Sequence, residues 1–385
     1  VSVEDERGVF RRTTFASRKD EIIVLRLSGM GKQTAELSFN ALEARDEREE
    51  IMKEEGVKFS EQGVKDDFLY FRTLFANQNP YNPNIGFEGI GRIVTKGGTT
   101  TKTDSSIIIS DAKEILLLVK IEPLLKGVGV ESNYDLLKDQ INAVEPNYSA
   151  LLKSHAEIHS DLMDRVSLSL EAPDSDRTLP NETLIKKFRN SQGSLAFTER
   201  AFDAGRYNII SSTGFHPPNL LGLWSASWFA KWSGSFTTNG NLPCAISFNL
   251  MGNTPELMEP YFRYYDERWD GFRKNAKMFY GCRGFHVPAQ LTVSPLLTNF
   301  SPGYPLHYSH AGAPWALQFY YDYYQYTGDK EFLKERAYPL MKEAAEFYED
   351  FLTIIDDKGK FVFVPSYSPE NYPNGGPPSS INATM

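Results

Sequence analysis

Short apolar runs, each followed by polar turn residues, make up the first third of the chain. They are "EIIVLRL" (21–27), "AELSFNAL" (35–42), "FLYFRTLFA" (68–76) and "EILLLVKI" (114–121), and Gly, Asp and Thr clusters such as "TKGGTTTKTDSS" lie between them. Several strands at this spacing, with no clear helices between them, favour an antiparallel sandwich over a parallel α/β sheet. The pattern therefore predicts a β-sandwich domain over residues 1–128.

The pattern then changes to helical spacing. Residues 129–197 are predicted to form a helical linker, broken at Pro146. In the following region, 198–385, "APWALQFYYDYYQYTG" has apolar residues at helical spacing and ends at Gly328, which suits a left-handed C-cap. Asp329 suits the N-cap of the next helix, and helices joined by so short a turn must lie antiparallel. Repeated hairpins of this kind predict an (α/α)6 toroid, and we expect both this barrel and the sandwich to be partial in the chain.

Composition narrows the possible partners. The chain has 385 residues, of which 41% are hydrophobic and 24% charged, as is usual for a globular protein. The net charge of −9 argues against binding to nucleic acid or to an anionic membrane surface. No apolar run approaches the ~20 residues that span a bilayer, so we expect no membrane insertion. No signal peptide lies at Val1, yet we expect the full-length protein to be exported to the periplasm or the cell exterior.

Three local patterns resemble cofactor or metal motifs but fail on spacing. "LSGMGKQT" (27–34) has Gln33 where a phosphate-binding loop needs Ser or Thr, and "GFEGIG" (86–91) has its glycines in the wrong order for a dinucleotide site. His155 and His159 lie one helical turn apart in "HAEIH", but no third metal ligand is evident nearby. We therefore expect no cofactor and no metal.

One group of candidate residues lies in loops that combine aromatic and polar side chains. Asn239 and Asn241 end the stretch "WSGSFTTNGN", and their two amides would share a face if the segment is extended, where they could grip a water or a sugar hydroxyl. A turn with Asx hydrogen bonds is the alternative. Aromatic and imidazole side chains that could line a sugar pocket are Trp224, Trp228, Trp232, His286, His310 and Trp315. Burial alone would explain the tryptophans equally well.

A second candidate is Glu370, in "VPSYSPEN" (364–371). It is the one carboxylate in a Pro-flanked loop beside the aromatic helices. An apolar neighbourhood would raise its pKa and keep it protonated near neutral pH, which suits a general acid. The alternative is that Glu370 caps a helix N-terminus with help from Ser366 or Ser368.

From about residue 150 onward the chain resembles glycoside hydrolase family 95, whose activities are α-L-fucosidase and α-L-galactosidase. The matching stretches are "HAEIHSDLMDRVSLSL", "FDAGRYNIISSTGFHPPNLLGLW", "WSGSFTTNGN", "YYQYTGDKEFLKERAYPLMKEAAEFYEDFL" and "VPSYSPEN". The resemblance implies a β-sandwich, a helical linker, an (α/α)6 barrel and a further β-domain. It also implies that this chain begins inside the first domain and stops inside the barrel.

The resemblance implies an inverting mechanism with Glu370 as general acid and with Asn239 and Asn241 orienting the attacking water. The family's base is an aspartate well downstream, which would lie beyond Met385. Thr237 occupies the position two before the N-x-N motif, where His is linked to fucose and Thr to tolerance of L-galactose. We also expect Asn371 to contact substrate. The family's "TEMNYW" after the motif is replaced here by "LPCAISF", and its "NLQG" by "NLLG".

The sequence therefore predicts an inverting exo-glycoside hydrolase that removes terminal α-L-fucosyl or α-L-galactosyl residues from oligo- or polysaccharides. A non-catalytic carbohydrate-binding protein would use the same aromatic pocket without the base. A phosphorylase on a similar helical barrel is the other alternative, and it would want a basic phosphate pocket near the acid. None is conspicuous in residues 360–385.

Overall fold

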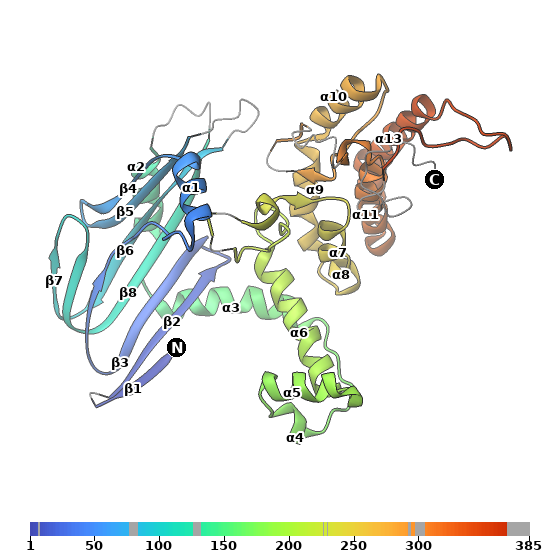
Figure 1. Cartoon of the computed structure of the whole chain (residues 1–385). Helices are drawn as coiled ribbons and strands as arrows, with labels where there is room; N and C mark the ends of the chain where they lie inside the picture. The colour runs from blue at the N-terminus through green and yellow to red at the C-terminus, as the bar shows by residue number, and fades with distance from the viewer. Residues whose placement is uncertain are drawn as a thin grey trace. The chain divides into compact units, whose positions relative to one another are not determined.

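The structure, a computed structural model, describes residues 1–6, 8–76, 84–125, 132–225, 227–228, 230–291, 294–296 and 305–367. The chain forms two compact units (Figure 1). The first comprises Val1–Ser160 with the short segment Ala226–Ala230, and the second comprises Asp161–Ser225 with Lys231–Met385. The division into a sandwich (1–128), a linker (129–197) and a barrel (198–385) stays a prediction.

The first unit is built on one eight-stranded antiparallel sheet, in the order β1-β2-β3-β8-β6-β5-β4 with β7 paired to β8. Its strands are β1 (Ser2–Asp5), β2 (Gly8–Ser17), β3 (Ile22–Leu37), β4 (Val57–Lys65), β5 (Phe68–Phe75), β6 (Asn84–Lys96), β7 (Thr99–Lys102) and β8 (Ile107–Leu125). All four predicted apolar runs contribute residues to these strands. The antiparallel β-unit followed by helices confirms the predicted fold class.

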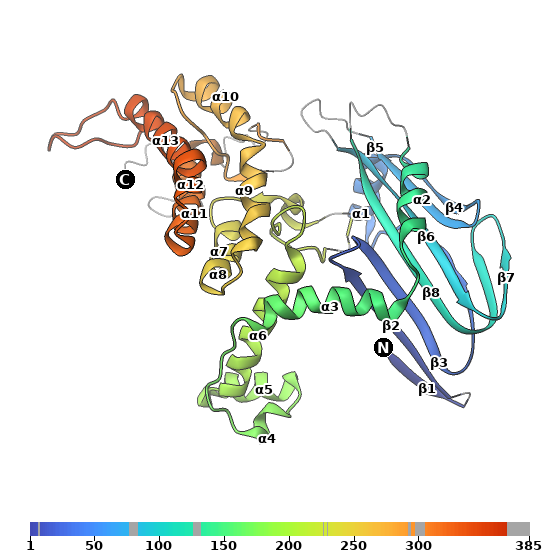
Figure 2. The same cartoon turned by 180° about the vertical axis from the view of Figure 1, so that it is seen from behind.

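Both faces of the sheet are apolar at its centre, which explains the near-continuous apolar run in β8. On one face, helix α2 (Tyr134–Ala143) covers the sheet (Figure 2). It packs Leu137 and Ile141 against Val24, Ile90 and Leu118. On the other face, the buried residues are Leu69, Ile107, Ile109, Ala112, Ile115, Leu117 and Val119, with Phe39 packed against them. A strand covered on both faces loses the alternation of a half-exposed strand.

Helix α1 (Glu47–Gly56) interrupts the strands, and the sequence pattern had not predicted it. Its N-terminus is capped by the Asp46 side chain, which accepts a hydrogen bond from the Glu49 N–H at 2.9 Å. Glu49 is its one buried residue, so the helix has no apolar stripe from which periodicity could reveal it.

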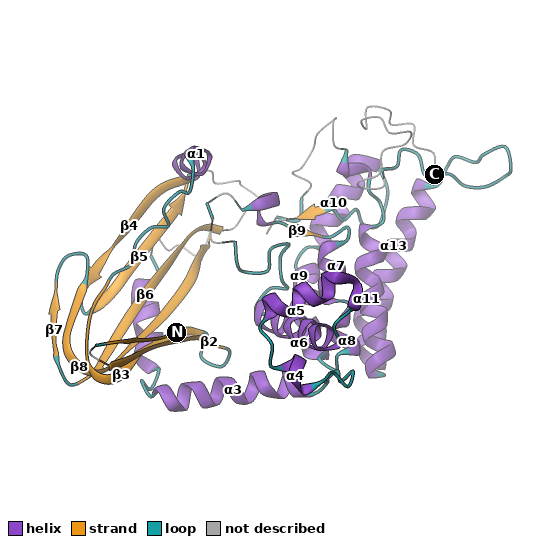
Figure 3. Cartoon of the chain, turned by 60° about the horizontal axis from the view of Figure 1, so that its bottom comes forward, coloured by secondary structure: helices purple, strands orange, loops and turns teal. Residues whose placement is uncertain are grey.

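The second unit is mainly helical (Figure 3). Helix α3 (Tyr148–Asp164) runs into it from the first unit, and Pro146 does separate α2 from α3 as predicted. The longer helices are α6 (Leu195–Ser212), α9 (Glu259–Asp266), α10 (Trp269–Tyr280), α11 (Gly312–Thr327) and α13 (Tyr338–Phe351). The shorter ones are α4 (Asp174–Arg177), α5 (Asn181–Lys187), α7 (Asn241–Ile246), α8 (Phe248–Met251) and α12 (Lys330–Phe332).

The predicted helix boundaries at the α11–α12 turn are confirmed. Gly328 is left-handed, with φ of 70°, and ends α11. The Asp329 side chain accepts a hydrogen bond from the Phe332 N–H at 2.9 Å and begins α12. Pro260 and Pro339 lie in the first turns of α9 and α13, where a missing N–H costs no helical hydrogen bond.

Aromatic side chains from α9, α10 and α11 form the core of this unit. Tyr261, Tyr265, Phe272 and Tyr320 are fully buried there. Each such side chain contributes about 1.5–3 kcal/mol when it is removed from water. The aromatic residues of α11 supply Phe319 and Tyr320 to this core.

Candidate active site

A two-residue strand fixes the segment that leads to the paired asparagines. In this strand, β9 (Phe236–Thr237), Thr237 pairs with Gln290 of β10 (Gln290–Leu291). The next residue, Thr238, is buried, and its N–H donates to the carbonyl of Ala289 at 2.9 Å. The Thr238 hydroxyl also donates to the carbonyl of Pro288. Main chain and side chain thus hold this segment against residues 288–291.

Asn239 and Asn241 lie in a turn rather than in an extended strand. Residues 238–240 form the turn, and Asn241 is the first residue of α7. The Cys244 N–H donates to the carbonyl of Gly240 at 2.8 Å, which closes the first turn of this helix. Asn239 is half-buried and Asn241 is exposed. Among the described residues, neither carboxamide has a hydrogen-bond partner, and its role in binding water stays a prediction.

The chain that leads to Glu370 packs against Ala289, the residue that precedes β10. Tyr367 is buried, and its N–H donates to the carbonyl of Tyr308 at 3.0 Å. Tyr367 packs in one apolar cluster with Ala289, Leu306 and Tyr308. Ala289 is the residue whose carbonyl accepts the Thr238 N–H. Two segments that lie far apart in the sequence are therefore joined through Ala289.

Glu370 and Asn371 lie outside the described residues. Tyr367 and Ala289 are the two residues that sequence analysis missed here. An alanine and a tyrosine in apolar surroundings carry no signal of a catalytic role.

Several buried polar atoms lie on the segments that build this region. They are the hydroxyls of Ser235 and Thr237 and both ring nitrogens of His286 and of His310, and none of them has a hydrogen-bond partner among the described residues. Buried polar groups are almost always paired in folded proteins, with protein atoms, water or a ligand. Hydroxyl and imidazole groups without internal partners suit a ligand rich in hydroxyls.

Both histidines are neutral at physiological pH. Burial lowers the pKa of His286 to about 4, and the main chain of His307 offsets only part of this effect. Burial, and then the charge of His286, lower the pKa of His310 to about 3. A neutral imidazole offers one donor and one acceptor, as a sugar hydroxyl does. The ring of Tyr280 lies 5.3 Å from the His286 ring and 5.1 Å from the His310 ring.

The four tryptophans that were predicted to contact a sugar lie in different surroundings. Trp224 and Trp232 are more than half exposed, so their indole faces are open to a sugar ring. Trp228 belongs to the first unit, where its indole N–H donates to the Leu42 carbonyl at 2.6 Å and Lys53 lies over its ring. Trp315 is half-buried against the aromatic core. Trp228 thus belongs to a different unit from the other three tryptophans, and their contacts with a sugar stay a prediction.

No metal site emerges from the part of the chain that the structure describes, since no group of three or more His, Cys, Asp or Glu side chains is placed to hold an ion there. Over the same residues, no helix combines the length and the apolar character that crossing a membrane requires.

Structural comparison places the chain in a class of proteins that join an antiparallel β-unit to a helical toroid. It is similar to a putative kojibiose phosphorylase from the human microbiome, with a TM-score of 0.62 at 12% identity. That match covers 94% of this chain and 45% of the phosphorylase, and it shows the fold alone.

Sequence comparison then gives the family. Residues 147–385 match the catalytic domain of glycosyl hydrolase family 95, and the chain belongs to this family, as the sequence motifs predicted. Alpha-L-fucosidase 2 of Arabidopsis thaliana is 28% identical over 411 residues, which cover 98% of this chain and 47% of the relative. Probable alpha-fucosidase A of Aspergillus niger is 30% identical over 250 residues, which cover 62% of this chain and 30% of that relative. The chain spans about half or less of the length of these relatives.

Proposed function

We propose that the full-length protein is an inverting glycoside hydrolase that releases terminal α-L-fucosyl or α-L-galactosyl residues from oligo- or polysaccharides. Membership of family 95 and the similarity to alpha-L-fucosidase 2 support this activity. The observation that carries the proposal is the junction at Ala289. Through it, the segment that precedes Glu370 and the segment that precedes Asn239 belong to one small structural region.

In the proposed mechanism, Glu370 donates a proton to the leaving glycosidic oxygen as that bond breaks. Asn239 and Asn241 hold a water, whose oxygen attacks the anomeric carbon from the opposite face. A second carboxylate must accept the proton of this water, and in inverting enzymes the two carboxyl groups lie about 6.5–9.5 Å apart. The space between them accommodates the water.

Sugar hydroxyls would be bound by the polar groups that lack internal partners. Thr237, His286 and His310 each offer a donor or an acceptor on a fixed segment. Trp224 and Trp232 expose indole faces that suit the apolar face of a sugar. Asn371, which follows the acid directly, is a further candidate for a substrate contact.

The stereochemistry of the first product tests this proposal. An α-L-fucoside is mixed with the full-length protein, and proton NMR follows the anomeric signals before mutarotation. Inversion predicts β-L-fucose as the first product, formed at a rate that does not depend on added phosphate. α-L-Fucose as the first product would contradict the mechanism, and turnover that requires phosphate would instead indicate a phosphorylase.

A further inference from the structure

Exposed aromatic side chains lie on the loops that precede β9. Phe215, Trp224 and Trp232 are 66%, 58% and 59% exposed, and all three belong to the second unit. Apolar side chains scattered singly over a surface need no explanation, whereas a group of them marks a binding site. The contacts of the three loops decide which of these two cases applies.

Two of the loops are held together at Ser235. The Ser235 N–H donates to the carbonyl of Trp232 at 3.1 Å, which closes the turn that carries Trp232. The Ser235 carbonyl accepts the N–H of Leu220 at 3.2 Å, which holds the loop that continues to Trp224. Ser235 directly precedes β9, so both loops are fixed beside the strand that contains Thr237.

The loop of Phe215 packs against the same strand. The ring of His216 lies 6.2 Å from that of Phe236 in β9 and 6.3 Å from that of Tyr264. The Arg263 guanidinium lies over the Phe215 ring, 4.2 Å from its centroid, and thus covers one ring face. Three loops therefore meet at β9, and each carries an exposed aromatic side chain.

The backbone at Trp232 adds a second observation. Trp232 has φ of 50°, a left-handed conformation that is rare and strained for a bulky residue. A glycine would adopt it without strain. Because the indole is more than half exposed, burial in the protein gives little in return for this strain. Strained residues of this kind are typical of ligand-binding positions.

The buried side of the same segment is polar. Ser235 and Thr237 flank Phe236, whose ring packs 4.5 Å from that of Tyr264. In an extended segment, side chains two residues apart point to the same side, opposite to the residue between them. The hydroxyls of Ser235 and Thr237 are buried and have no hydrogen-bond partner among the described residues. Polar groups that suit a sugar are therefore buried here, and the aromatic groups beside them are exposed.

We propose that Trp232 and Trp224 bind the sugar to which the terminal residue is linked. This inference rests on the proposed function and names the part of the substrate that the two side chains contact. The buried hydroxyls suit the terminal sugar, and the rest of the glycan extends from it toward solvent, where the indoles lie. The C–H groups of a pyranose form an apolar face that stacks on an exposed indole. The substrate is thus a fucosylated oligo- or polysaccharide, recognised on both sides of the bond that is cleaved.

The test compares two substrates of the full-length protein. A fucosylated oligosaccharide has a sugar on the leaving-group side, whereas α-L-fucosyl fluoride has only fluoride there. The ratio of kcat/KM for the oligosaccharide to that for the fluoride therefore reports contacts with the leaving-group sugar. We expect Trp232→Ala and Trp224→Ala each to lower this ratio about 10-fold, as the loss of an aromatic contact residue does.

Trp232→Gly separates binding from folding. Glycine accepts the left-handed backbone of this turn, so relief of strain offsets the lost side-chain contacts. We expect the Tm to stay within about 3 °C of the wild-type value, while the ratio falls as in Trp232→Ala. A large fall in Tm, with an unchanged ratio, would show that the indole serves packing and would overturn the inference.

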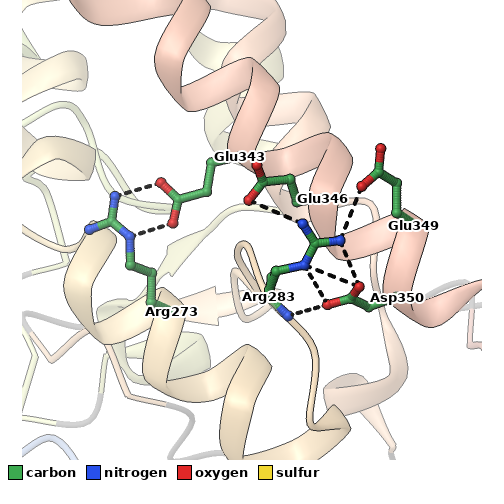
Figure 4. Close-up of polar contacts among 6 residues, drawn as sticks. All are labelled: Arg273, Arg283, Glu343, Glu346, Glu349 and Asp350. Atoms are coloured by element: carbon green, nitrogen blue, oxygen red, sulfur yellow. Dashed lines mark hydrogen bonds and ion pairs between the residues drawn. The ribbon is translucent and has the colours of Figure 1, made fainter.

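Two control variants change the second unit elsewhere. Tyr326 is 58% exposed near the end of α11, and Tyr326→Ala removes an aromatic side chain of similar exposure. Arg283 follows α10, and its guanidinium pairs with Glu346, Glu349 and Asp350 of α13 (Figure 4). Arg283→Ala should lower the Tm by removing these pairs. In both controls we expect the ratio to stay within about twofold of the wild-type value.

Three results would contradict the inference, each in a different way. A ratio that both tryptophan variants leave within about twofold of the wild-type value would overturn it. The same fall in Tyr326→Ala as in Trp232→Ala would show that the effect is not specific to these loops. An unchanged ratio with a changed sedimentation coefficient in Trp232→Ala would identify a contact between copies of the chain. If the wild type hydrolyses neither substrate, the proposed function itself fails.

Discussion

The main-chain N–H of Thr238 donates to the carbonyl of Ala289 at 2.9 Å, and Ala289 also packs against Tyr367. A single small residue thus contacts the segments that precede both proposed functional groups. An alanine suits this place because its methyl group leaves room for Leu306 and Tyr367 in the same cluster. These contacts of Ala289 explain how two segments far apart in the sequence come together, which the separate motifs do not explain.

The hydroxyl of Thr238 is the first group whose removal tests this junction. Thr238→Val keeps the shape of the side chain but leaves the buried Pro288 carbonyl without its donor. We expect the free energy of unfolding to fall by about 1–3 kcal/mol, and kcat to fall with it because Asn239 is adjacent. Urea unfolding and steady-state kinetics measure the two effects.

Thr327→Val is the control for this substitution. The Thr327 hydroxyl also donates to a carbonyl, that of Tyr323 at 2.7 Å, but at the exposed end of α11. We expect a change within about 0.5 kcal/mol there. Equal losses in the two variants would show that the Thr238 hydroxyl has no special role.

His310 should make stability depend on pH. Its pKa is about 3 in the folded protein, below the 6.5 expected when unfolded, so the unfolded chain binds the extra proton first. The stabilising effect of the neutral ring is complete above about pH 6.5 and is lost as the pH falls toward 3. Between pH 7.5 and 5 this amounts to on the order of 2 kcal/mol.

His310→Phe isolates this contribution, because the ring of His310 already lies 4.3 Å from that of Phe351. We expect Tm to fall less steeply with acidification in the variant than in the wild type. Parallel curves of Tm against pH would mean that His310 is not buried as a neutral ring.

Much of the fold could be predicted from periodicity and capping. The boundary at Gly328 and Asp329 and the break at Pro146 depend on local backbone preferences, which single residues determine. Helix α1 could not be predicted in this way, because its one buried residue is Glu49 and it lacks an apolar stripe. Hydrophobic periodicity and capping residues therefore predict most of the secondary structure.

Only part of the proposed site could be predicted from the sequence. The N-x-N and S-P-E motifs identified Asn239, Asn241 and Glu370, but not what brings their segments together. Ala289 and Tyr367 have ordinary identities, and they matter because they pair with residues more than 40 positions away in the sequence. The structure also changed the expected geometry, since Asn239 and Asn241 lie in a turn that leads into α7.

Asn239 and Asn241 are expected to act on the water rather than on the sugar. If they orient the attacking water, Asn239→Ala or Asn241→Ala should lower kcat much more than it raises KM. Initial rates over a range of fucoside concentrations separate the two effects. An unchanged kcat with a raised KM would identify either amide as a simple sugar contact.

Thr237 is expected to tolerate the C6 hydroxyl that distinguishes L-galactose from L-fucose. Thr237 is buried, and its hydroxyl has no hydrogen-bond partner among the described residues. We therefore expect the full-length protein to act on both glycosides, with the galactoside at least competitive. Thr237→His should shift the ratio of kcat/KM toward the fucoside, because the larger ring fills the space of that hydroxyl.

The ratio of kcat/KM for the two aryl glycosides measures this preference in wild type and variant. A fucoside preference above about 100-fold in the wild type would contradict it, since an added hydroxyl is rejected only weakly by an unspecialised pocket. A ratio that Thr237→His leaves unchanged would place Thr237 outside the pocket.

The central claim is that Glu370 supplies the proton to the leaving group, and Glu370→Gln tests it most directly. The amide keeps the shape of the acid but has no proton to give, and general acid catalysis contributes about 10²–10⁴-fold. The measurement compares kcat/KM of wild type and variant on a natural fucosylated oligosaccharide and on an aryl fucoside with a good leaving group. The account predicts a loss of about 10²-fold or more on the oligosaccharide and a much smaller loss on the aryl fucoside. An equal, small loss on both substrates would contradict it.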